Sequence, residues 1–327
     1  MTTNEFPAHA PLAVQTRGEL VESVHYGSLA AVDPTGTLLL SRGDPSASVY
    51  PRSALKPLIA VGLLRAGLRL PADQLALAAA SHSGAAAHQQ LATAILTGAG
   101  LDESALRNST DLPYGVAERE AWLRAGRGPT RLAQNCSGKH AALLATCVLN
   151  GWPLENYLDP GHPLAALIRA TVAELTGDPI TAISTDGCGT EVFGLSLTGL
   201  ARAFGKLTTA AAGTAEHDVA AAMRAHPTLV AGPGRDVTTL MEAVPGLLAK
   251  DGFEGIQAIA LADGTAVALK IADGGDRARM PAAVPALLAL GVDSALLDEF
   301  NHLPVCGGGH PVGELRGLPV SDLPLLL

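Results

Sequence analysis

Runs of β-favouring residues near both ends of the chain predict two β-hairpins. Residues 28–33 and 37–41 are separated by a Pro-Thr-Gly turn, in which proline and glycine supply the backbone angles that a turn requires. Residues 256–261 and 266–271 form a second, apolar pair around Asp-Gly, a dipeptide typical of tight hairpin turns. Both ends of the chain are therefore expected to contribute strands.

The middle of the chain shows the helical period of hydrophobic residues, with stops at glycines. The predicted helices span residues 53–64, 74–80, 140–149, 163–175, 214–225 and 277–290. Strands from distant segments with helices between them predict one sheet assembled from both ends, plus an all-helical lobe. We expect a single compact chain with two interleaved lobes, in which about 1–50 and 251–327 form the sheet lobe and about 51–250 the helical lobe.

Composition narrows the classes of partner. The chain has 327 residues, 48% of them hydrophobic, which suffices for a large core. Lys and Arg total 22 against 31 Asp and Glu, and no basic run is present, so a nucleic-acid partner is not expected. Charges, glycines and prolines break every long apolar segment and no targeting segment is apparent, so we expect a cytoplasmic protein without membrane contact.

A Ser-x-x-Lys pattern at a predicted helix start is the first candidate for chemistry. Ser53 and Lys56 would share one helix face, where a desolvated lysine could accept the serine proton and make the hydroxyl nucleophilic. The alternative is a helix-capping serine followed by a solvated lysine. Ser81, in Ser-His-Ser after an apolar helix, is a second candidate, although adjacent residues do not face each other and no G-x-S-x-G motif supports a Ser-His-Asp triad.

Two cysteines in glycine-flanked polar loops suggest a metal site. Zinc prefers thiolate and imidazole ligands, so Cys136, Cys188 and His140 are the candidates that the residue types alone favour. Isolated thiols are also common as small buried hydrophobic residues. Lys270 stands in an apolar strand, where a charge is costly unless paired, and the alternative is a solvent-facing edge position.

Five motifs in order, R-S-x-x-K, S-H-S, N-C-S-G-K-H, T-D-G-C and L-K-I-x-D-G, resemble those of the class 3, rhizobial-type L-asparaginases, also called L-asparaginase II. The resemblance implies an α+β fold like that of serine β-lactamases and penicillin-binding proteins, with an antiparallel sheet from the N- and C-terminal segments and an inserted helical lobe. It also implies a homodimer and a site that holds two Ser-Lys tandems beside a zinc ion.

Carried over by motif, the implied tandems are Ser53 with Lys56 and Ser81 with Lys270. Arg52, beside the nucleophile, resembles a partner for the α-carboxylate of the substrate. The expected reaction is attack of Ser53 on the side-chain amide of L-asparagine, release of ammonia and hydrolysis of the aspartyl ester by water. A fixed distance between Arg52 and Ser53 predicts preference for L-asparagine over L-glutamine.

The resemblance also changes the expected metal ligands. It implies zinc held by Cys136, Lys139, Cys188 and water, so that a lysine takes the place of His140. Asp186 lies close by in the motif and is assigned, like Arg52, to substrate binding. Two rival hypotheses stay open: another Ser-x-x-Lys acyl-transfer hydrolase of the β-lactamase or amidase type, and a non-catalytic binding protein that zinc stabilises.

Overall fold

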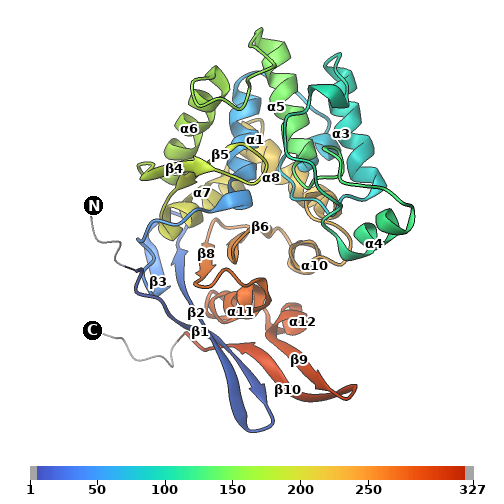
Figure 1. Cartoon of the computed structure of the whole chain (residues 1–327). Helices are drawn as coiled ribbons and strands as arrows, with labels where there is room; N and C mark the ends of the chain where they lie inside the picture. The colour runs from blue at the N-terminus through green and yellow to red at the C-terminus, as the bar shows by residue number, and fades with distance from the viewer. Residues whose placement is uncertain (1–5, 321–327) are drawn as a thin grey trace.

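An antiparallel sheet runs through the centre of the protein (Figure 1). The structure, a computed structural model, describes residues 6–320, and within that range the sheet has eight strands. Their order is β6-β7-β8-β2-β1-β10-β9, and β3 pairs with β2 beside this path. The strands are β1 (Ala10–Arg17), β2 (Leu20–Val32), β3 (Leu38–Arg42), β6 (Leu248–Gly252), β7 (Ile256–Ala260), β8 (Ala266–Ile271), β9 (His302–Gly307) and β10 (His310–Gly317).

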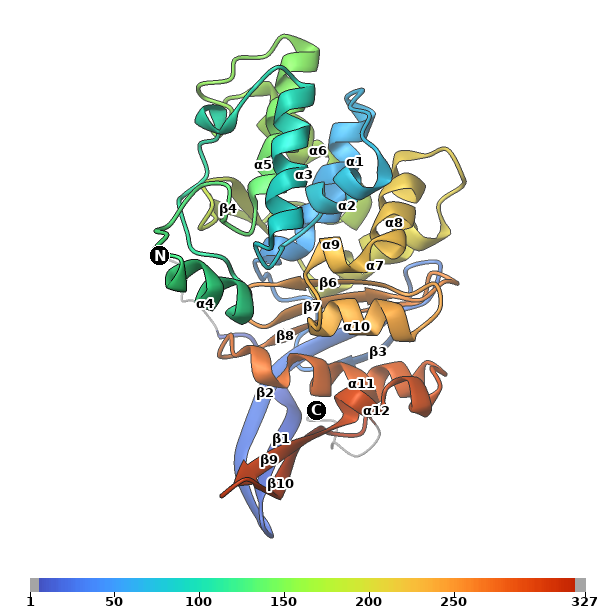
Figure 2. The same cartoon turned by 90° about the vertical axis from the view of Figure 1, so that its right-hand side faces the viewer.

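Strand β2 joins the two parts of this sheet because its halves have different partners. Its first half pairs with β1, whereas its second half pairs with β8 on one side and β3 on the other. The second half is buried and built from small or branched residues, Leu29 to Val32, which allow helices to approach closely. The hairpins β1–β2 and β9–β10 extend beyond the helices as a ribbon (Figures 1 and 2).

The segment between β3 and β6 forms a mainly helical lobe. It contains the 3-10 turns η1 (Arg52–Leu55) and η2 (Glu103–Ala105), the strands β4 (Ala182–Thr185) and β5 (Glu191–Gly194), and the helices α1 (Lys56–Arg65), α2 (Ala72–Ala78), α3 (Ala86–Gly98), α4 (Val116–Arg124), α5 (Ser137–Asn150), α6 (Pro163–Thr176), α7 (Leu197–Thr209), α8 (Ala215–Ala225), α9 (Pro227–Val230) and α10 (Asp236–Ala243). After the sheet follow η3 (Asp276–Ala278), α11 (Arg279–Ala289), η4 (Ser294–Leu296) and α12 (Asp298–Asn301). Helices α7 and α11 lie on opposite faces of the strands β6 to β8 (Figure 2).

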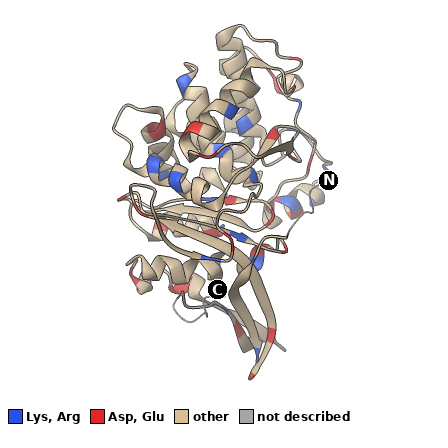
Figure 3. Ribbon diagram, turned by 90° about the vertical axis from the view of Figure 1, so that its left-hand side faces the viewer, with Lys and Arg blue, Asp and Glu red and all other residues tan. Residues whose placement is uncertain are grey.

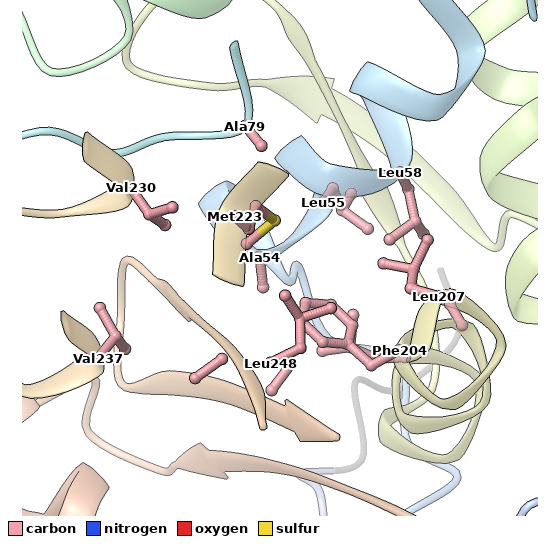
Figure 4. Close-up of a cluster of buried hydrophobic side chains, with 14 of the residues drawn as sticks. Ala54, Leu55, Leu58, Ala79, Phe204, Leu207, Met223, Val230, Val237 and Leu248 are labelled. Atoms are coloured by element: carbon pink, nitrogen blue, oxygen red, sulfur yellow. The ribbon is translucent and has the colours of Figure 1, made fainter. Parts of the chain in front are cut away.

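An apolar core joins the helical lobe to the sheet (Figure 4). Phe204 and Leu207 of α7 point toward Leu248 of β6 and toward the start of α1, and all are fully buried or nearly so. Helix α7 can lie so close to the sheet because position 205 is glycine: a Cβ there would come within 2.4 Å of the Gly264 carbonyl oxygen. The same core backs the segments that carry the candidate site residues.

The structure confirms the α+β class, the sheet built from distant segments and both predicted hairpins. All six predicted helices are present, although residues 52–55 form a 3-10 turn before α1 begins at Lys56. Sequence analysis missed β1, β9, β10 and several helices, among them α7. The reason for α7 is physical, since its two internal glycines lower helix propensity and tertiary packing compensates for them. The predicted lobe boundaries near residues 50 and 250 stay predictions.

Two observations concern a membrane and a nucleic acid as possible partners. No helix among residues 6–320 is long and apolar enough to cross a membrane. Acidic and basic residues are interspersed over the part of the protein drawn in Figure 3, and no basic segment stands out there. The formal net charge of the chain is −9.

The core position of Phe204 gives a stability prediction. Replacing Phe204 by alanine should lower the free energy of unfolding by about 3–5 kcal/mol, because a fully buried ring is lost and its cavity cannot collapse completely. The matched control is Phe6→Ala, since that ring is 94% exposed and its removal should change little. Urea unfolding followed by circular dichroism measures both, and equal midpoints for the two variants would contradict this account.

Candidate active site

The turn that carries Ser53 is held in an unusual backbone conformation. Arg52, immediately before it, has φ +54°, a left-handed conformation that costs a non-glycine residue about 1–3 kcal/mol. The end of β6 packs closely against this turn: a Cβ at Gly252 would lie 2.2 Å from the Pro51 carbonyl oxygen. Ser53 is thereby fixed at the start of α1, next to the sheet edge.

Lys56 is buried and reaches across to the second candidate serine. Its ammonium group donates hydrogen bonds to the Ala80 carbonyl oxygen at 2.7 Å and to Ser81 Oγ at 2.9 Å. The Ser81 backbone is fixed in turn by a hydrogen bond from its N–H to the Val230 carbonyl oxygen. Lys56 is therefore hydrogen-bonded to Ser81, the serine that the resemblance pairs with Lys270, and not to Ser53.

Lys270 lies away from this cluster. It sits on β8, where its ammonium group donates to the backbone carbonyl oxygens of Glu254 at 2.6 Å and Ile271 at 2.7 Å. The expected pairing of Ser81 with Lys270 is thus not formed in the structure. The strand position is compatible with a charge because two backbone carbonyl oxygens accept hydrogen bonds from the ammonium group.

Sequence analysis missed a second buried lysine, Lys250 on β6. Its side chain is fully buried, and its ammonium group donates to the backbone carbonyl and to the carboxylate of Asp251. Burial lowers the pKa of Lys250 to about 8; the Asp251 charge opposes this effect, and the charge of Lys56 adds to it. The signal was available, because Lys250 interrupts an apolar strand just as Lys270 does.

Asp251 links Lys250 to Arg235, because it accepts hydrogen bonds from both side chains. The Arg235 guanidinium donates to the Asp251 carboxylate at 2.7 Å and lies 4.8 Å from the Tyr114 ring centroid. Burial alone would raise the pKa of Asp251, but the charges of Lys250, Arg235 and Arg279 outweigh it and hold that pKa far below its usual range. This carboxylate is therefore ionised and balances a cluster of buried cations.

Two adjoining cavities, which share several lining residues, lie beside the candidate serines. The inner one is small and is lined by both candidate serines with Tyr114, Asn135, Asp251, Gly252, Phe253 and Asp276. The outer one has a volume of about 240 Å³ and is lined by Arg52, Ser53, Asn135, Cys136, Asp186, Cys188 and Phe253, among others. Pockets for drug-sized ligands measure roughly 300–1,000 Å³, so this site suits a smaller molecule.

Arg52 and Asp186 form an ion pair in the wall of the outer cavity. Nε and Nη2 of Arg52 lie 2.7 and 2.6 Å from Oδ1 of Asp186, and both side chains are only partly buried. The structure thus brings the two predicted substrate-binding residues together. Their opposite charges face the cavity side by side.

The three implied zinc ligands also meet in the structure, and all are buried. Lys139, in the first turn of α5, donates to Cys188 Sγ at 3.1 Å and to Thr190 Oγ1 at 2.7 Å. A hydrogen bond with Cys136 and the Lys139 charge hold the pKa of Cys188 well below its usual value, although burial opposes them. The hydrogen bond with Cys188 and burial raise the pKa of Cys136.

This donor set fits zinc chemically, with two sulfurs and one nitrogen. Burial acts to lower the pKa of Lys139, but negative charge at Cys188, Cys136 and Asp186 outweighs it and raises that pKa. Lys139 would therefore bind a metal only after losing a proton.

Within residues 6–320 no three His, Cys, Asp or Glu side chains form a group that could hold a metal, so His140 does not complete a set with the cysteines. His140 Nδ1 lies 2.8 Å from the Tyr157 hydroxyl. Burial lowers the pKa of His140 to about 4, although a hydrogen bond with Cys188 acts to raise it.

The buried charge cluster predicts that Asp251→Asn lowers the free energy of unfolding at pH 7 by about 3–5 kcal/mol, because it leaves buried cations without their counter-charge. The control is Glu120→Gln, which removes a surface ion pair with Arg124 and should have almost no effect. Chemical denaturation measures both; an Asp251→Asn variant as stable as the control would show that Asp251 does not balance these charges.

Two solved structures superpose on this chain at low sequence identity. A β-lactamase from Mycobacterium bovis superposes with a TM-score of 0.42 at 14% identity, over 84% of this chain and 94% of that one. EstCE1, a hydrolase with promiscuous acyltransferase activity, superposes with a TM-score of 0.42 at 14% identity, over 79% and 91%. A search of curated proteins gives no match. The sequence profile of the L-asparaginase II family, however, matches residues 13–317, nearly the whole chain, and this protein therefore belongs to the L-asparaginase II family.

Proposed function

We propose that this protein hydrolyses the side-chain amide of L-asparagine to L-aspartate and ammonia. The observation that carries the proposal is a small cavity lined by Ser53 and Ser81, behind which Lys56 donates to Ser81 and Lys250 donates to Asp251. The Arg52–Asp186 ion pair lies in the wall of the adjoining outer cavity. Membership of the L-asparaginase II family supports the same reaction class.

The ion pair matches the two charged groups of a free amino acid. In the proposed complex the Arg52 guanidinium binds the α-carboxylate, and the Asp186 carboxylate accepts hydrogen bonds from the α-ammonium group. Their contact with each other is then replaced by contacts with the substrate. The side-chain amide extends from this anchor to the inner cavity, where Ser53 and Ser81 lie.

Ser53 is the proposed nucleophile. It lines both cavities, whereas Ser81 lines only the inner one and is already hydrogen-bonded to Lys56. The Ser53 hydroxyl attacks the amide carbon, and its proton passes to the cluster formed by Ser81, Lys56 and Lys250. Lys250, with a pKa of about 8, is the member that is partly neutral near physiological pH and can leave the cluster with a free base. The C–N bond then breaks, the nitrogen leaves as ammonia after protonation, and water hydrolyses the aspartyl ester.

Zinc is part of the proposal as a resident ion held by Cys136, Lys139 and Cys188. Bound there, it would supply a Lewis acid with a coordinated water beside the outer cavity, which Cys136 and Cys188 line together with Ser53. The homodimer and the cytoplasmic location expected from sequence stay predictions, as does the absence of a nucleic-acid partner.

Ser53→Ala should reduce kcat for L-asparagine by about 10³-fold or more while leaving the fold intact, because the covalent step is lost. Ser81→Ala should retain more activity, since it removes only a proton relay. Ammonia release at saturating substrate measures both. A Ser53→Ala enzyme of near-normal rate beside an inactive Ser81→Ala enzyme would reverse the two roles, and rapid cleavage of a chromogenic β-lactam by the wild type would favour the rival acyl-transfer function.

The zinc proposal predicts about one zinc per chain in the purified protein, as expected for a site with three protein ligands and water. Cys136→Ser and Cys188→Ser should each lose the metal, because each removes a thiolate ligand. Cys306→Ser, at an exposed cysteine remote from the cavities, is the control and should keep it. Elemental analysis by mass spectrometry measures the metal content; full zinc content in both ligand variants would place the ions elsewhere.

A further inference from the structure

Phe253 occupies a position that neither the motifs nor the reaction explains. It lies in the turn between β6 and β7, and 48% of its surface is exposed although it is a large apolar side chain. It lines both the inner and the outer cavity. Its ring centroid lies 6.4 Å from that of Tyr114, with the rings tilted by 60°. An apolar ring therefore stands where the two cavities adjoin.

The ring also supports the proposed anchor of the substrate. The Arg52 guanidinium lies over the Phe253 ring, 5.7 Å from its centroid, while Asp186 engages two nitrogens of that guanidinium. A cation over an aromatic face is attracted by about 0.5–2 kcal/mol, so the ring favours one position of the guanidinium. The distance from the Arg52 guanidinium to the Ser53 hydroxyl therefore depends on the position of the Phe253 ring.

The neighbouring strand holds this turn. Glu254 has φ +64°, a conformation that a non-glycine residue keeps only when its surroundings fix it. Lys270 Nζ donates to the Glu254 carbonyl oxygen at 2.6 Å, and the Ile271 N–H donates to the Gly255 carbonyl oxygen at 2.9 Å. Strand β8 thus fixes the two residues that follow Phe253.

We propose that Phe253 determines the length of amide side chain that the site accepts, and that Lys270 is a positioning residue that holds the Phe253 turn. The proposal rests on the proposed function insofar as Arg52 anchors an α-amino acid. With the ring in place, the route from Arg52 to Ser53 suits a substrate with one side-chain methylene. Glutamine, one methylene longer, places its amide carbon beyond the point of attack.

Phe253→Ala should lower the asparagine-to-glutamine ratio of kcat/KM by about tenfold or more, because one methylene in an apolar pocket accounts for about 10–200-fold discrimination. The change should come from both sides, with glutamine turnover rising and asparagine turnover falling. Ammonia release from the two amides measures the ratio. Leu39→Ala, at an exposed residue of β3 that lines neither cavity, is the matched truncation and should leave the ratio unchanged.

Lys270→Met should shift the ratio in the same direction by a smaller factor, and Lys270→Arg should restore it, since arginine can also donate to both carbonyl groups. Lys206→Met is the matched control, because Lys206 likewise donates to two backbone carbonyl groups, those of Glu174 and Leu175, but lines neither cavity. If Lys270 instead transferred protons for Ser81, both Lys270 variants would lose turnover of both amides without a change in their ratio, and that result would overturn the positioning role.

A binding measurement separates this proposal from the proposed function. Calorimetric affinities for L-aspartate and L-glutamate need no turnover, and the wild type should prefer aspartate while Phe253→Ala loses that preference. If the wild type releases ammonia from neither amide yet shows this binding pattern, the proposed function fails and the role of Phe253 stands. Unchanged selectivity in both assays for a folded Phe253→Ala variant overturns it; Phe253→Leu, which keeps an apolar side chain, replaces alanine if that variant does not fold.

Discussion

The site depends on one requirement, that Lys56 and Lys250 be buried without leaving their amines unsatisfied. Both side chains are almost completely inaccessible to water, and an unpaired buried ammonium group costs several kcal/mol. Lys56 meets the requirement with Ala80 and Ser81, and Lys250 meets it with Asp251. The Lys56 contacts tie the start of α1 to the loop after α2. Arg235, which pairs with Asp251, ties the residue before α10 to the end of β6.

The apolar core explains why these polar groups remain dry. The residues next to the reactive ones, Ala54, Ala79 and Leu248, pack in the cluster drawn in Figure 4. These apolar residues lie behind the turn that carries Ser53, the loop that carries Ser81 and strand β6. The effective dielectric constant is low in such apolar surroundings, so charge interactions are strong there. The pKa of Lys250 and the pKa of Asp251 therefore both lie far below their usual values.

Sequence patterns predicted the elements better than the partners within the site. The hairpins follow from turn chemistry. Ser53 stands out in a Ser-x-x-Lys pattern, Ser81 in a polar stretch after an apolar helix, and Cys136 and Cys188 in glycine-flanked polar loops. Which lysine serves Ser81 could not be predicted, because that depends on how β6, β8 and α1 lie in space. Lys139 is a similar case: ordinary ligand chemistry favours an imidazole, and only the resemblance pointed to an amine.

The left-handed backbone at Arg52 has a consequence for how this chain can change. Glycine would relieve the strain at that position, so the fold by itself favours a residue without a side chain there. The guanidinium that pairs with Asp186 is available only if the strain is kept. Mutational drift toward a more stable turn would therefore erase the proposed anchor for the substrate. Thermostability engineering guided by backbone geometry alone would select against the same arginine.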